Sequence, residues 1–451
     1  MRMKKIGIAS LVVAVGSWTM FAASSEDSAN GQAFLERSQV LGEWFGGRPF
    51  LSEQGVNFFG GYTVEVWGNT TGGIKTGSVY TGLLDFGVEV DLEEAVGWKG
   101  ASLSTTWLWL SGRDASEDLV GNFLTISNIS GFNTLRMFEL WFQQELWEGM
   151  LSIRLGQLSA DSEFLISDYS GLFINGTFGW PALASMNLPN GGAAYPMGTP
   201  GIRIAGNPVD WFTFQAAVLQ GDVFAPDVNR HGFRWRLDAA TGYTFLSEAQ
   251  IRWNQREEET GLPGQLKSGA WFQTGGSADA LADSTDSGNT GFYAILDQML
   301  YRESGEATPS VGDGKTAVSG GTKSFKTPVP IEKINQGLGW FGRVGFAPQD
   351  RNFVNFYFDT GLTYKGLLPT RDDDTLGIAF GYAQISNGAR SSLEAEGSSP
   401  TGAEMVIECT YQAQITPWLT IQPDLQYIIN PGGTSDHGNA LVIGGRAAVT
   451  F

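Results

Sequence analysis

The stretch Leu84-Asp85-Phe86-Gly87-Val88-Glu89-Val90-Asp91 decides the fold class. Apolar side chains occupy every second position, and the positions between them are glycine or acidic. Alternation with a period of two is typical of a β-strand that has one apolar and one polar face. The stretch therefore predicts a strand between an apolar environment and an aqueous one.

The same alternation recurs along the chain. Apolar positions alternate with polar ones around Phe233, Trp235 and Leu237, and again around Ile407 and Cys409. Each strand alone fits a soluble β-sandwich as well as a membrane barrel. The candidate strands lie near residues 57–67, 79–91, 101–111, 135–147, 150–158, 201–207, 211–220, 231–240, 243–256, 267–274, 290–300, 337–347, 353–364, 375–386, 403–413, 418–429 and 441–451.

The number and length of these strands favour a transmembrane barrel. About sixteen or seventeen strands are predicted, many of roughly ten residues, which is the length that a tilted strand needs to cross a bilayer. Backbone groups inside lipid must all be paired, so such a sheet has to close on itself. A barrel of this width leaves an aqueous lumen, with polar faces inward and aromatic-rich faces outward. We expect an all-β, antiparallel transmembrane barrel of about sixteen strands with inward-folded loops.

Both ends of the chain fit export to an outer membrane. A basic start is followed by an apolar stretch from Ile6 to Ala23 and by small residues, which is typical of a secretory signal peptide. We expect a signal peptide over 1–24, a periplasmic or plug-like segment with a short helix over 25–54, and the barrel over 55–451. The final strand ends in Phe451, as in strands read by the barrel-insertion machinery, which we expect to be a partner together with outer-membrane lipid.

Composition excludes several classes of function. The net charge of -19 argues against nucleic acid as a partner. With two histidines and one cysteine, neither a multi-histidine metal centre nor a thiolate cluster is expected, and we expect no cofactor. Asp161 and Glu163 form a carboxylate pair of the kind used by glycosidases, but no cleft or nucleophile motif accompanies them. The chain is therefore predicted not to be an enzyme.

Three segments interrupt the strand pattern. Residues 161–200 combine glycine, asparagine, serine and proline with large aromatic side chains, so we expect an ordered loop folded against or into the barrel. Residues 302–330 and 386–401 contain few large apolar residues, and we expect mobile external loops there.

The tract from Leu155 to Arg203 resembles the carbohydrate-selective outer-membrane porin family. The resemblance rests on Gly156-Gln157-Leu158-Ser159-Ala160-Asp161-Ser162-Glu163-Phe164, on Ser167-Asp168-Tyr169-Ser170-Gly171-Leu172-Phe173-Ile174-Asn175, and on Phe178-Gly179-Trp180-Pro181-Ala182. Supporting matches include Gly42-Glu43-Trp44-Phe45-Gly46-Gly47-Arg48-Pro49-Phe50-Leu51 and Leu419-Thr420-Ile421-Gln422-Pro423-Asp424. The resemblance implies a roughly sixteen-stranded barrel whose loops narrow a pore for glucose-like or other sugars. The insertion near 302–330 departs from the family.

Sugar permeation requires flat aromatic faces and polar groups that replace water at the hydroxyls. Alternation with apolar neighbours predicts that Arg154 and Arg203 face the lumen. Trp180 fits sugar stacking, but a loop anchor packed by Pro181 explains it better; Asp161 and Asp168 equally fit turn caps. The candidate pore-lining residues are Arg154, Asp161, Glu163, Asp168, Asn175, Trp180 and Arg203, with Arg234, Arg236, Glu404 and Glu408 as charges of the wall.

Two alternatives to a sugar pore stay open at this point. The negative net charge favours a general or cation-preferring porin without sugar selectivity. A lumen plugged by residues 161–200 would instead make the chain a structural barrel or adhesin. The particular sugar, the pore radius and the oligomeric state do not follow from the sequence.

Overall fold

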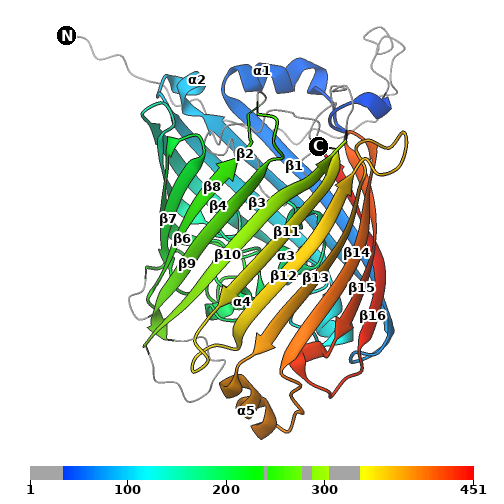
Figure 1. Cartoon of the computed structure of the whole chain (residues 1–451). Helices are drawn as coiled ribbons and strands as arrows, with labels where there is room; N and C mark the ends of the chain where they lie inside the picture. Colours follow the sequence, from blue (N-terminus) through cyan, green and yellow to red (C-terminus); the bar gives the residue numbers. More distant parts are fainter. Residues whose placement is uncertain (1–33, 238–240, 257–258, 277–286, 304–335) are drawn as a thin grey trace, which may run out of the picture.

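The computed structural model describes residues 34–237, 241–256, 259–276, 287–303 and 336–451. In this part of the chain, sixteen antiparallel strands form a closed barrel in which each strand pairs with its neighbours in sequence and β1 pairs with β16 (Figure 1). The strands are β1 (Val56–Thr71), β2 (Gly77–Asp91), β3 (Ala101–Gly112), β4 (Thr134–Leu146), β5 (Leu151–Leu158), β6 (Thr199–Val209), β7 (Phe212–Gln220), β8 (Tyr243–Trp253), β9 (Gly264–Gly276), β10 (Ser287–Arg302), β11 (Gly337–Phe346), β12 (Val354–Lys365), β13 (Thr375–Ile385), β14 (Ala403–Thr416), β15 (Leu419–Ile429) and β16 (Ala440–Thr450).

Helical turns are short and lie in the connections. They are η2 (Phe34–Glu36), η3 (Trp44–Gly46), α1 (Gly47–Glu53), α2 (Leu92–Val96), the π-helical turn η4 (Ser116–Val120), η5 (Ser170–Leu172), α3 (Gly176–Gly179), α4 (Ala182–Ser185), η6 (Pro189–Gly191), α5 (Asn387–Ala395) and η7 (Pro431–Gly433). None of the described helices is long and apolar enough to cross a membrane.

The predicted strands are confirmed with one exception. Residues 231–240 form no strand over their described part, 231–237, which instead belongs to the connection between β7 and β8. The prediction was wrong because an alternating segment can also lie extended outside the ladder, and periodicity alone does not show which backbone partners it finds. Arg234 and Arg236, which lie in this segment, are therefore not charges on a strand of the wall.

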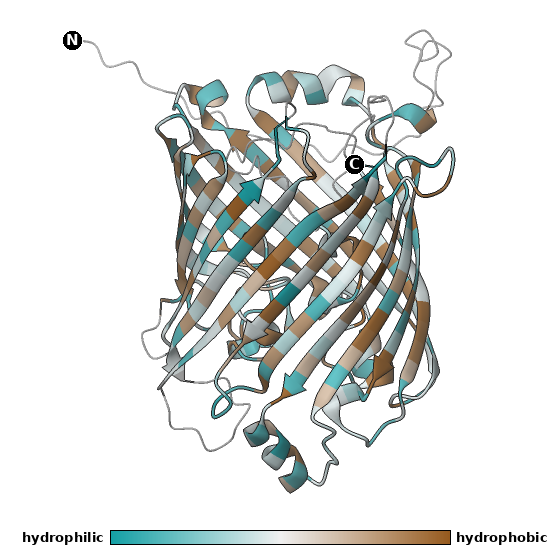
Figure 2. Ribbon diagram, in the orientation of Figure 1, coloured by the Kyte–Doolittle hydropathy of each residue, from teal (hydrophilic) through white to brown (hydrophobic). Residues whose placement is uncertain are grey.

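The two faces of the wall differ as the alternation predicts. In β2, Phe86 is exposed on the outer side, whereas Glu89 on the opposite face is buried. Figure 2 shows hydrophobic and hydrophilic residues alternating along the strands. The seam between β1 and β16 carries an inward ion pair, because Arg446 Nη2 lies 2.5 Å from Oε1 of Glu65, its partner in the pairing register.

The two ends of the barrel carry different elements. The C-terminus, α1 and α2 lie at one end, called the terminal end, and α5 lies at the opposite, distal end (Figure 1). The residues that flank the predicted loop near 302–330 are Arg302 and Gly337, at strand ends on the terminal side, while most of the loop itself lies outside the described residues. The expected loop over 386–401 contains the helix α5, which Ser386 caps by accepting a hydrogen bond from Ala389 N.

The described part of the N-terminal segment is held at the terminal end. The amide of Val40 donates to Thr450 O at 3.0 Å, and the indole of Trp418 donates to Phe34 O at 3.2 Å. The short helix expected before the barrel is α1. The predicted signal peptide lies outside the described residues.

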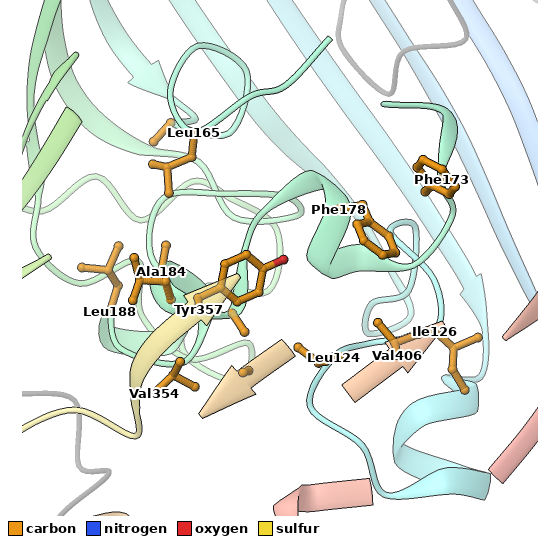
Figure 3. Packing of buried hydrophobic residues seen from close by; sticks show 14 of the residues in the cluster. Leu124, Ile126, Leu165, Phe173, Phe178, Ala184, Leu188, Val354, Tyr357 and Val406 are labelled. Atoms are coloured by element: carbon orange, nitrogen blue, oxygen red, sulfur yellow. The ribbon is translucent and has the colours of Figure 1, made fainter. Parts of the chain in front are cut away.

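Two connections fold into the lumen. They are the first tract, residues 113–133, and the second tract, residues 159–198, both of which start at the distal end. Their apolar side chains pack together and against inward residues of the wall, as Figure 3 shows for Leu124, Phe178 and Tyr357. The inward-folded loop expected over 161–200 is thereby found, and the first tract joins it in one core.

Candidate pore constriction

The second tract is attached to the wall through backbone amides. Glu408, on β14, accepts hydrogen bonds from Ile174 N at 2.6 Å and from Asn175 N at 3.0 Å. Glu248, on β8, accepts a hydrogen bond from Leu165 N at 3.2 Å. Carboxyl oxygens accept hydrogen bonds from the backbone N–H groups of the tract, so these side chains fix its backbone against the wall.

The first tract is held in the same way by Glu404, which lies two inward positions before Glu408 on β14. The carboxylate of Glu404 accepts from Leu124 N at 2.6 Å, from Phe123 N at 3.1 Å and from Gly432 N at 2.6 Å. Asn175 joins the two tracts, because its side-chain amide donates to Leu124 O at 2.9 Å. Glu404, Glu408 and Asn175 are fully buried, so they hold the two tracts in place rather than lining open space.

Arg343 and Asp359 form a buried pair on β11 and β12 beneath the second tract. Arg343 Nη2 lies 2.5 Å from Asp359 Oδ2, and Tyr357 donates to the same oxygen. The guanidinium also donates to Leu165 O and Gly179 O, both at 3.1 Å, and to Thr177 O at 2.9 Å. Arg343, on β11, therefore binds Asp359 on the neighbouring strand and three carbonyl groups of the tract at once.

Glu163 links the second tract to two arginines of the wall. Arg154 and Arg203 face each other on β5 and β6, and Glu163 lies 2.7 Å from Arg154 Nη1 and 2.5 Å from Arg203 Nε. The guanidinium of Arg154 also stacks over Trp141, 4.1 Å from the ring centroid. Burial acts to raise the pKa of Glu163, but the two arginines outweigh it and hold the pKa below its ordinary value.

The carboxyl group of Asp161 accepts a hydrogen bond from Tyr195 N at 2.7 Å within the second tract. Burial raises the pKa of Asp161 to about 6. An aspartate in an unfolded chain titrates near pH 4, at about 3.9. Because the folded pKa is the higher of the two, Asp161 stabilises the fold fully below pH ~4, and this stabilisation is lost as the pH rises through ~6.

Replacing Asp161 with asparagine is expected to remove this pH dependence. The variant should gain about 3 kcal/mol over the wild type between pH 4 and pH 8, since asparagine resembles the neutral acid and does not titrate. Thermal unfolding of the purified protein in detergent at several pH values measures the difference. Asp227→Asn, at an exposed carboxylate, serves as the control, and parallel pH profiles of the wild type and Asp161→Asn would contradict the assignment.

Asp168 is the most open of the predicted residues in the second tract. Its side chain is 70 % exposed, and its carboxylate lies 3.7 Å from Lys267 Nζ and accepts from Gln265 at 2.7 Å. Its own amide donates to Asp297. Lys267, Gln265 and Asp297 belong to the buried inward face of β9 and β10, so Asp168 lies on the lumen side of the tract.

The remaining predicted residues have other surroundings. Trp180 donates from its indole to Gly191 O at 2.9 Å and packs against the core of the two tracts. The guanidinium of Arg234 lies over Phe224, 5.3 Å from the ring centroid, and Arg236 is exposed nearby. Neither arginine lies with the cluster around Glu163.

Sequence reasoning missed much of this arrangement. The first tract was not predicted to fold inward. Its apolar residues Leu119, Leu124 and Ile126, which lie between two strands and are buried, were the available signal. Glu248, Arg343 and Asp359 were also missed, although isolated charges within strands are the signal that marks such inward positions. Their partners are distant in sequence, so no local pattern shows what they bind.

Comparisons with known proteins agree with this architecture. The family model described as "Carbohydrate-selective porin, OprB family" matches residues 75–451. The chain is 25% identical to Porin B of Pseudomonas aeruginosa over 462 residues, covering 93% of each chain, and 21% identical to the putative porin QuiX of Acinetobacter baylyi, covering 99% of each. The high-pH structure of Pseudomonas putida OprB superposes with a TM-score of 0.75 at 22% identity, covering 93% of this chain and 100% of that one.

Proposed function

Because the chain belongs to the OprB family of carbohydrate-selective porins, we propose that sugars cross the outer membrane past the two tracts held inside its barrel. The protein is an outer-membrane porin for sugars, and thus a channel rather than an enzyme. The observation that carries the proposal is the attachment of both tracts to inward carboxylates of the wall. A fixed constriction selects solutes by size and contact, and weak contacts let them leave again.

The charges around the constriction favour uncharged solutes. Glu163 bridges Arg154 and Arg203, and Arg343 is paired with Asp359, so each of these buried charges already has a partner within the core. Removal of an ion's hydration shell is costly unless a free opposite charge replaces it. A neutral pyranose loses less hydration free energy than an ion when it enters, which supports glucose-like or related sugars as the solutes.

Asp168 is the residue that we assign to direct sugar contact. Its exposed carboxylate faces the lumen and can accept hydrogen bonds from sugar hydroxyls. The half-buried ring of Tyr169 follows it and lies against β11, where a side chain at Gly339 would meet the ring at 2.2 Å. The buried residues Glu163, Glu404 and Glu408 are assigned a different role, which is to hold the constriction in place.

Single-channel recordings in planar bilayers test both proposals. Added glucose is expected to reduce the current of the wild type, and Asp168→Asn should weaken this block about fivefold, because a hydrogen bond to a charged acceptor becomes a neutral one. Asp210→Asn changes an exposed carboxylate at the connection between β6 and β7 and should leave the block unchanged. Strong cation preference with no response to sugar would instead favour the general porin that the net charge of -19 suggests.

A further inference from the structure

The strand β5 leaves the sheet early, which exposes part of the edge of β4. Pairing between these strands runs from Leu146↔Leu151 only as far as Leu140↔Gln157. The chain then turns into the lumen as the second tract, so residues 134–139 of β4 have no partner in β5. Unpaired backbone groups are costly inside a membrane wall.

A segment from the connection between β7 and β8 covers this edge. We call residues 228–237 the strap. The amide of Met137 donates to His231 O at 3.1 Å, the imidazole Nδ1 of His231 donates to Leu135 O at 2.8 Å, and the indole of Trp235 donates to Gln157 at 2.5 Å. Gly232 has a φ of +77°, and a Cβ there would lie 2.0 Å from Met137 O, so only glycine permits this approach.

The outer side of the strap is apolar and joins the lipid-facing surface. Phe233, Trp235 and Leu237 are 61 %, 51 % and 70 % exposed. Phe233 contacts Trp107 edge to face at 5.7 Å, and Trp107 lies on the outer face of β3 near the exposed Trp109. The strap thus continues the outer aromatic surface at the distal end of the barrel.

The strap is also basic within an acidic protein. Residues 228–237 contain Arg230, Arg234 and Arg236 and no acidic residue, although the chain carries a net charge of -19 and Asp227 and Asp238 border the segment. All three arginines are exposed. Arg230 uses one N–H on Asn133 O at 2.6 Å, which anchors the strap to the wall.

We propose that the strap is a binding site for a phosphate-bearing lipid of the leaflet at the distal end. Its aromatic side chains enter the acyl region, as the aromatic residues at membrane interfaces do. Its guanidinium groups lie in the same short segment, at headgroup level, where their planar forks match phosphate oxygens. The basic charge and the continuity with the lipid-facing wall together distinguish this site from an aromatic belt alone.

Native mass spectrometry of the delipidated full-length protein in detergent tests the site, with diphosphorylated lipid A and phosphatidylcholine as probes. The wild type should prefer lipid A, and Arg234→Gln/Arg236→Gln should weaken lipid A binding about tenfold while the bonds of Arg230, His231 and Trp235 keep the strap docked. Arg234→Lys/Arg236→Lys keeps the charge and should recover part of the affinity. Arg113→Gln/Arg390→Gln, at the same end, is the matched control and should bind as the wild type does.

Three results would overturn the proposal. The first is equal binding of lipid A by the glutamine variant and the control. The second is inorganic phosphate binding as tightly as lipid A, since the acyl chains would then contribute nothing. The third is a particle that falls to half its mass in the glutamine variant, which would assign the strap to contact with a second copy of the chain. Unchanged single-channel conductance of the variant shows that the barrel has folded.

Discussion

Replacing Arg343 with methionine is expected to loosen the second tract and to weaken sugar block. The substitution removes hydrogen bonds to three carbonyl groups of the tract and leaves Asp359 buried without its partner. Breaking a buried ion pair by removing one member costs about 3–5 kcal/mol. We expect a lower unfolding temperature, noisier open-channel current and weaker block by glucose.

A double variant separates the two consequences. Arg343→Met/Asp359→Leu replaces the whole pair with apolar side chains, so most of the lost stability should return. The bonds to the tract stay absent, so glucose block should stay weak. If the double variant recovers block together with stability, Arg343 acts only through the stability of the barrel and the tract is held by other residues.

Replacing Glu163 with glutamine is expected to destabilise the protein about as much as Arg343→Met does. Arg154 and Arg203 are direct neighbours across β5 and β6, and like charges in this position repel each other. Without the carboxylate, both guanidinium groups remain buried and lack their shared counter-ion, at a cost of about 3–5 kcal/mol. The loss is measured as a fall in the temperature at which the folded barrel converts to the unfolded band on gels.

Ion selectivity gives an independent readout of the same change. Glu163→Gln raises the net positive charge of the cluster with Arg154 and Arg203 by one unit, so the reversal potential in a potassium chloride gradient should shift toward chloride. Arg154→Met/Glu163→Gln removes one of the two arginines and should recover part of both properties. Unchanged selectivity in Glu163→Gln would show that the cluster does not face the path of the ions.

The barrel was predictable because its pattern is local. The alternation in β2 or β14 shows which side chains face lipid and which face the lumen, and the closure of the sheet follows from the need to pair every backbone group. The ordered second tract was also predictable, since long loops rich in aromatic residues are rarely without structure. The segment around Trp235 has the same alternation but forms no strand of the barrel. Its backbone instead contacts the edge of β4, which the alternation alone does not show.

The attachment of the tracts was not predictable from any local pattern. Glu408 binds Ile174 N across 234 residues of sequence, and Glu404 binds Leu124 N across 280. In the sequence, Glu404 and Glu408 have the appearance of charges that line a water-filled wall. Only the fold shows that backbone amides of the tracts cover them.

Alternation within single strands is enough to specify the membrane barrel and its two faces, since a period of two depends on the residues of one strand alone. Only the folded chain shows where the two tracts lie and which partners Glu163, Arg343 and Asp168 have. The physical reason is that a buried charge must find partners wherever the closed sheet brings them. Those partners lie on other strands and in both tracts, so the opposite side of the barrel decides which charges are buried and which, like Asp168, remain open to the lumen.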